Sequence, residues 1–198
     1  MPLIVVDVEG MPSPAIAPAR AFAAVLVHPD PEKRVGFCAR LHGKPLGRSH
    51  IFTSGHPAKF ATDFYNAPTG EPRPNTLSER VEVISAAFVR EVMSSFADWI
   101  FDLHDTYKTR PVFLSDNPAF DWQHINYLFH DTIGTNPFGH SARRIGDFYA
   151  GLSNRWRSSS DWKKFRQTKH THHPLDDAHG NVEAFIEICR RFEIEVPT

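Results

Sequence analysis

The chain has 198 residues and a mass of 22.5 kDa, the size of one domain. Hydrophobic residues make up 41% and charged residues 23%, an ordinary globular composition that excludes an intrinsically disordered chain. Cys38 and Cys189 are too few for a disulfide-stabilised secreted domain and lack the spacing of a zinc finger. No apolar run approaches the ~20 residues that span a bilayer, and the first ten residues lack a secretory signal. We therefore expect one soluble cytoplasmic domain over residues 1–198, with no membrane partner.

The N-terminal part of the chain predicts three strands. Residues 3–8 form a nearly continuous apolar run rich in β-branched side chains, typical of a central strand covered on both faces. Residues 22–27 and 35–41 indicate two further strands, with a turn at residues 28–31 between them. Residues 42–76 contain much of the glycine and proline and predict an irregular segment.

A long amphipathic helix is predicted next. Residues 76–79, TLSE, have the form of a capping box, which marks the start of a helix. Apolar residues then follow at spacings of three and four, as on one face of a helix. They are Val81, Ile84, Phe88, Val92, Phe96, Trp99 and Leu103.

Short strands and helices alternate in the C-terminal half. Residues 112–114 indicate a strand, and Asn117 with Pro118 opens a helix to about residue 129. Residues 134–140 indicate a loop, residues 145–151 the start of another helix, and residues 174–191 a last helix. This order predicts an α/β fold in which helices flank a mixed sheet.

The net charge of −1 conceals an uneven distribution of basic residues. Residues 143–169 carry a net charge of +6, against −7 for the rest of the chain. A basic segment with interleaved aromatic residues suits a polyanion whose bases can stack. The alternative is a solvated surface with its aromatic side chains in the core. The aromatic residues are Phe148, Tyr149, Trp156, Trp162 and Phe165.

Two acids lie at the end of the first predicted strand. Side chains alternate along a strand, so Asp7 and Glu9 project from the same face, roughly 6.5–7 Å apart. Like charges held that close disfavour mutual ionisation unless a cation lies between them. The alternative is that both acids face solvent where the strand emerges.

Asp121 belongs to the buried face of its predicted helix, in a column with Ile125 and Leu128. An inward-facing carboxylate needs a partner, because an unpaired buried charge is costly. A cation fulfils that need, and so does a buried pair with an arginine or a hydroxyl group.

The segment before the last predicted helix adds histidines and a further acid. Asp177 neighbours the apolar stripe of that helix, whereas Asp176 shares a solvated column with Glu183. Both aspartates could instead serve as first-turn acids that complement the helix dipole. His170, His172 and His173 suggest a zinc site, but no further cysteine or well-spaced histidine completes a familiar ligand pattern.

Three blocks of the sequence together resemble the DEDDh exonucleases, the group of ribonuclease T and the proofreading subunits. The first block is VDVEG at residues 6–10, the second is NPAFD at residues 117–121, and the third is HHPLDDA at residues 172–178. They occur in the family's order and on the expected elements. Gly10 stands where many relatives have Thr or another side chain, and Pro174 replaces the usual small residue; neither change removes a ligand.

The resemblance implies a ribonuclease H-like fold and a metal-dependent 3′–5′ exonuclease. Asp7, Glu9, Asp121 and Asp177 would hold two Mg²⁺ or Mn²⁺ ions about 3.5–4 Å apart, with His172 as general base. The substrate would be single-stranded RNA or DNA with a free 3′ end, RNA slightly favoured, and the products nucleoside 5′-monophosphates. Several family members pair, which allows a homodimer. Substrate-contacting candidates are Gly10, Asn117, Phe120, Lys163, Lys164 and Arg166.

Two other functions fit parts of the sequence. The first is a nucleic-acid-binding module on the same fold, with weak or partner-dependent catalysis. The second is a zinc hydrolase that uses the histidine cluster. Zinc co-purifying at one equivalent, with no activity in Mg²⁺ or Mn²⁺, would favour the hydrolase.

Overall fold

The apolar run after the first residues forms the central strand of the sheet. β1 (Leu3–Glu9) pairs antiparallel with β2 (Ala21–Leu26) and parallel with β5 (Val112–Ser115). The computed structural model describes residues 1–10, 19–41, 81–86 and 89–197, and within them the strand order is β4-β3-β2-β1-β5-β6. The sheet is therefore mixed. This confirms the predicted α/β class and is consistent with a ribonuclease H-like fold.

The outer strands extend the sheet on both sides of this centre. β3 (Gly36–Leu41) pairs antiparallel with β2, after a turn that contains the short 3₁₀ helix η1 (Pro31–Lys33). β4 (Val81–Ala86) pairs parallel with β3, and β6 (Ala142–Arg144) pairs parallel with β5. β6 was not predicted, because three residues of sequence ARR carry no alternating apolar pattern.

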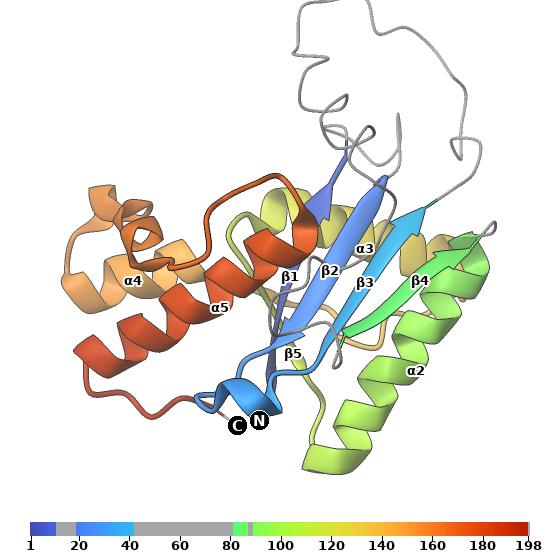
Figure 1. Ribbon diagram of the computed structural model, residues 1–198, viewed down its shortest axis with the longest axis horizontal. Helices are drawn as coiled ribbons and strands as arrows, with labels where there is room; N and C mark the ends of the chain where they lie inside the picture. Colours follow the sequence, from blue (N-terminus) through green and yellow to red (C-terminus); the bar gives the residue numbers. More distant parts are fainter. Residues whose placement is uncertain (11–18, 42–80, 87–88, 198) are drawn as a thin grey trace, which may run out of the picture.

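Helices cover both faces of the sheet (Figure 1). Ile4 and Val6 of β1 share a core with α2 (Val89–Tyr107) and α3 (Pro118–Thr132). Leu3 and Val5, which point to the opposite face, share a second core with α4 (Ile145–Ser153) and α5 (Pro174–Arg191). Burial on both faces explains why the run is continuously apolar rather than alternating. Among the described residues, no helix has the length and apolar character needed to cross a membrane.

The predicted start of the long amphipathic helix is wrong. Residues 81–86 form β4, and α2 begins only at Val89. The sequence VEVI favours an extended backbone because β-branched residues suit strands, and β3 supplies a parallel partner along its whole length. From Val92 onwards the predicted face holds, with Val92 and Phe96 fully buried. The predicted capping box, Phe88 and the irregular segment lie outside the described residues.

The basic segment is broken into short helices after α4. η2 (Trp156–Ser158) and η3 (Asp161–Phe165) are 3₁₀ helices, and η3 packs against α5. Gly146 of α4 permits this packing, because a Cβ built there would lie 2.3 Å from the carbonyl oxygen of Ser159. Trp162 of η3 is fully buried in the second core.

This close approach makes Gly146 a test of the packing between α4 and the η2–η3 segment. Gly146→Ala forces the Ser159 backbone to move, which costs about 1–3 kcal/mol of unfolding free energy. The melting temperature should fall by roughly 2–4 °C for each kcal/mol in a chain of this size.

Gly151→Ala is the matched control on the same helix. A Cβ at Gly151 meets nothing within 4 Å, so alanine should leave the melting temperature unchanged or raise it slightly. A Gly146→Ala protein that melts at or above the temperature of Gly151→Ala would contradict the packing described for α4.

Candidate metal centre

The carboxyl end of β1 brings two acids into contact with the start of α5. Asp7 and Glu9 lie on the same face of β1, opposite Ala23 and Ala21 of β2. One carboxylate oxygen from each of Asp7, Glu9 and Asp177 lies within 4.8 Å of the others. Three carboxylates from two segments about 170 residues apart therefore gather at one point. Figure 1 shows the end of β1 next to the start of α5.

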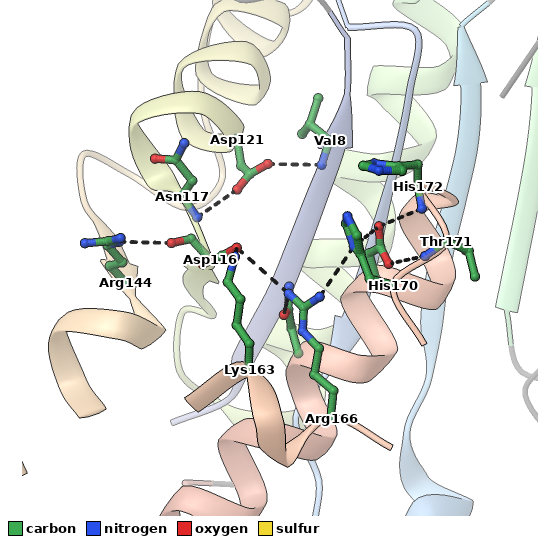
Figure 2. A network of polar contacts seen from close by, with 12 residues as sticks. Val8, Asp116, Asn117, Asp121, Arg144, Lys163, Arg166, His170, Thr171 and His172 are labelled. Atoms are coloured by element: carbon green, nitrogen blue, oxygen red, sulfur yellow. Dashed lines mark hydrogen bonds and ion pairs between the residues drawn. The ribbon is translucent and has the colours of Figure 1, made fainter. Parts of the chain in front are cut away.

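Asp121 joins this group from α3. Its side chain is 4% exposed, and its Oδ1 accepts a hydrogen bond from the backbone N–H of Val8 at 3.1 Å. Its Oδ2 accepts from the N–H of Asn117, the residue that caps α3, at 3.3 Å. Figure 2 shows this arrangement. The hydrogen bond to Val8 fixes Asp121 to the strand residue between Asp7 and Glu9.

Asp177 organises the loop that precedes α5. It is 1% exposed, and its two oxygens accept hydrogen bonds from the backbone N–H groups of Thr171 and His172 at 3.1 and 3.2 Å. His172 has a φ of 60°, a left-handed conformation that costs a non-glycine residue free energy. The two hydrogen bonds to Asp177 offset that cost. Asp177 therefore sets the position of His172.

His172 lies beside the carboxylates. Its Nδ1 is 3.8 Å from Oε1 of Glu9, and its ring packs edge-on against the ring of His170 at 4.2 Å. His173 instead caps α5, and its backbone N–H donates to Oγ1 of Thr171. Asp176 accepts a hydrogen bond from Thr171 Oγ1 at 2.7 Å on the partly exposed side of the first turn.

Burial and mutual repulsion disfavour ionisation of these acids. Burial, followed by the negative charges of Asp121, Asp177 and Glu9, raises the pKa of Asp7 well above its usual range. Burial and the charges of Asp177 and Asp121 raise the pKa of Glu9 to about 8. Burial raises the pKa of Asp121 to about 7, although its two backbone donors oppose the rise. A divalent cation would relieve this repulsion, and a set of carboxylate oxygens suits a hard cation such as Mg²⁺ or Mn²⁺.

The imidazole of His172 is disposed to be neutral. Burial, and then the neighbouring His170, lower the pKa of His172, while Asp177 opposes the shift. A neutral imidazole has a ring nitrogen that can accept a proton.

Asp116 anchors two of the predicted substrate-contacting residues. Its Oδ2 is 2.5 Å from Nζ of Lys163 and 3.9 Å from the guanidinium of Arg166 (Figure 2). Arg166, whose side chain is 10% exposed, also donates to Asn181 and lies 3.4 Å from Nδ1 of His170. Sequence reasoning missed Asp116, although its place between β5 and the cap of α3 was a usable signal.

The other predicted contact residues have separate surroundings. Gly10 directly follows β1, and Phe120 packs edge-on against His124, with ring centroids 4.8 Å apart. Lys164 is exposed and lies over the ring of Phe165 at 5.3 Å.

The structure separates the aromatic residues of the basic segment. Trp162 and Tyr149 are buried, and Phe148 and Phe165 pack against the second core. Trp156 is 81% exposed and stands between two exposed arginines, Arg155 and Arg157. Most of the rings therefore join the core, as the alternative interpretation expects, and the ring of Trp156 faces solvent.

Comparison with known proteins gives one informative similarity. No protein-family model matches the chain. A curated Escherichia coli protein, the 3′-5′ DNA exonuclease Cap18, is 38% identical over 100 residues, which cover 48% of this chain and 53% of the relative. The chain thus spans about half the length of this relative. The similarity supports the resemblance to 3′–5′ exonucleases that the three sequence blocks indicate.

The raised carboxyl pKa values predict how stability depends on pH without metal. Between about pH 4.5 and pH 8 the native cluster binds more protons than the unfolded chain, so its contribution to stability falls as pH rises. The metal-free melting temperature should therefore fall less between about pH 6 and about pH 8.5 in Asp7→Asn than in the wild type. At about pH 8.5, Mn²⁺ at 100 times its Kd should raise the wild-type melting temperature by roughly 5–10 °C.

Calorimetry of both proteins, with and without Mn²⁺, checks this prediction. Asp7→Asn should lose most of the Mn²⁺-dependent rise, because a ligand and a charge are both removed. Equal pH dependence and equal response to Mn²⁺ in the two proteins would show that Asp7 belongs to no such cluster.

Proposed function

We propose that the protein is a divalent-metal-dependent 3′–5′ exonuclease acting on single-stranded nucleic acid. The observation that carries the proposal is the gathering of Asp7, Glu9 and Asp177 beside His172, with Asp121 hydrogen-bonded to Val8 between the two acids of β1. The similarity to a 3′-5′ DNA exonuclease supports the same chemistry from an independent direction.

Asp7, Glu9, Asp121 and Asp177 would hold the cations. Their donor atoms are carboxylate oxygens, which Mg²⁺ and Mn²⁺ prefer, and two of the four side chains are almost fully buried. When bound, two such cations supply Lewis-acid chemistry that makes water a better nucleophile and stabilises a leaving oxygen. The hydrogen bonds from Val8 and Asn117 to Asp121 hold that carboxylate in place for binding.

His172 accepts the proton of the attacking water in this proposal. Burial and the neighbouring His170 lower the pKa of this imidazole, which favours its neutral form. The ring is partly exposed and lies next to Glu9, where a water molecule can reach both groups. The hydrogen bond from the backbone N–H of His172 to Asp177 ties the backbone of His172 to a proposed metal ligand. Hydrolysis at the last phosphodiester would release nucleoside 5′-monophosphates from the 3′ end.

DNA is the substrate that we favour. The sequence alone gives RNA a slight preference, whereas the relative is named for DNA. Gly10, which directly follows β1, is the proposed contact for the sugar of the terminal nucleotide. Labelled DNA and RNA strands of the same base sequence, incubated with EDTA, Mg²⁺ or Mn²⁺, decide between the two.

The basic segment would hold the strand upstream of the scissile bond. Lys163, Lys164 and Arg166 supply positive charge for phosphates, and the exposed ring of Trp156 supplies a stacking surface for a base. The contacts of Lys163 and Arg166 with Asp116 place this charge next to the cap of α3.

Substitutions in the site test the proposed roles. Asp7→Asn should lower Mn²⁺-dependent hydrolysis at least about 100-fold through loss of a ligand. His172→Ala should lower kcat by about 10²–10⁴-fold, with Mn²⁺ binding largely kept, because it removes proton acceptance only. Single-turnover hydrolysis of a 3′-labelled oligonucleotide, with Mn²⁺ binding measured by calorimetry, reads out both effects.

Two neighbouring substitutions serve as controls. Asp176→Asn and His173→Ala should leave hydrolysis within about threefold of wild type, because neither side chain belongs to the acid cluster. If His173→Ala were the damaging histidine change, the third sequence block would be shifted by one residue. Strand binding with no metal-dependent hydrolysis in the wild type would favour the binding module instead.

Trp156→Ala tests the stacking surface separately from the chemistry. Loss of one base–aromatic stack costs about 1–3 kcal/mol, so KM for a single strand should rise roughly 5–150-fold while kcat stays unchanged. Phe101→Ala is the control: it removes an exposed ring that lies on α2 rather than in the basic segment, and it should leave KM unchanged. Equal KM values in the two variants would remove Trp156 from the path of the strand.

A further inference from the structure

His170 is a second imidazole at the site that the proposed hydrolysis does not use. Its Nδ1 is 2.8 Å from Oδ2 of Asp177, and its ring lies 4.2 Å from the ring of His172. One donor atom from each of His170, His172 and Asp177 lies within 4.8 Å of the others. The sequence suggests a zinc site at His170, His172 and His173, whereas the structure groups Asp177, not His173, with His170 and His172.

The donor set differs in kind from the acid cluster next to it. Two imidazole nitrogens and one carboxylate oxygen are a borderline-soft set that suits Zn²⁺, whereas Mg²⁺ prefers oxygen alone. Three protein ligands with a fourth position open to water are a usual arrangement for a reactive zinc ion. Donors around a tetrahedral zinc ion lie ~3.4 Å apart, so small side-chain rotations close the group.

Access and rigidity both favour binding at this group. The side chain of His170 is 50% exposed and that of Asp177 is fully buried, so an ion can enter from solvent and reach a fixed carboxylate. Asp177 is held by the N–H groups of Thr171 and His172, so the carboxylate ligand is already in position and the backbone of His172 is tied to it.

Some neighbouring charges oppose a cation at this group, and others favour it. The guanidinium of Arg166, 3.4 Å from His170 Nδ1, opposes a cation there. It also donates to Asn181 and lies 3.9 Å from Asp116, which reduces this opposition only in part because Lys163 contacts the same carboxylate at 2.5 Å. Glu9 faces His172 from β1 at 3.8 Å and favours a cation. Asp7, which also shares the Asp177 cluster, adds to the negative potential.

We propose that His170, His172 and Asp177 bind one Zn²⁺ ion, and that this ion inhibits the enzyme by occupying the proton acceptor and a shared metal ligand. The binding part stands on geometry alone, and the inhibition part rests on the proposed exonuclease function. Zinc and the catalytic metals would then exclude one another, since both need Asp177.

Direct binding tests the site independently of any activity. Equilibrium dialysis with Zn²⁺ alone should show one more bound ion, or at least about tenfold tighter binding, in the wild type than in His170→Ala. His170→Gln serves as a second variant, and His104→Ala, an exposed histidine on α2, as the control that matches wild type. Thermal melting verifies that each protein is folded. Equal zinc binding in wild type and both His170 variants would overturn the proposal.

Inhibition by Zn²⁺ is then measured relative to the zinc-free activity of the same protein. The Zn²⁺ concentration that halves Mg²⁺-supported hydrolysis should be at least about tenfold higher in His170→Ala than in wild type and His104→Ala. If none of the proteins hydrolyses nucleic acid, the exonuclease function fails while the binding result still decides the zinc site. Zinc that supports hydrolysis by itself would overturn the inhibitory role.

Discussion

Repulsion among carboxylates buried at one end of the sheet is the constraint on which the candidate site depends. Asp7 and Glu9 end β1, Asp121 enters from α3, and Asp177 enters from the start of α5. A globular fold tolerates such a group only if protons or cations compensate its charge. The backbone supports the arrangement: N–H groups of Val8 and Asn117 hold Asp121, and those of Thr171 and His172 hold Asp177. These backbone hydrogen bonds therefore hold a group of acids whose repulsion lowers the stability of the metal-free fold and favours the binding of a cation.

Sequence reasoning succeeded where a residue's role follows from its own element. The continuous apolar run of β1, the Asn–Pro start of α3 and the Pro174 start of α5 each set local periodicity, and with it the burial of Asp121 and Asp177. It failed where a distant partner decides the outcome. The apolar residues among 81–86 have the spacing of a helix, yet this segment pairs with β3 and forms β4. β6 forms only because β5 offers a parallel edge.

The same distinction holds within the site. The spacing of residues along the chain predicted which acids face inward, but it could not predict the contacts between segments far apart in the sequence. The Asp116–Lys163–Arg166 contacts join residues about 50 positions apart, and they lead through Arg166 to His170 and Asn181. Arg166, which the sequence alone assigns to substrate binding, thus also belongs to a network of contacts that reaches His170 in the loop before α5. From the sequence, His170 is recognisable only as one of several clustered histidines. In the structure its ring contacts Asp177.

Locating a bound ion tests the account most directly. Crystals grown with Mn²⁺, measured at a wavelength where manganese scatters anomalously, should show a peak at ~2.1–2.3 Å from oxygens of Asp7, Glu9 and Asp177. Such a peak would establish that these carboxylates form a cation site at the end of β1. Fully occupied manganese elsewhere on the protein, with no peak among these three side chains, would contradict it.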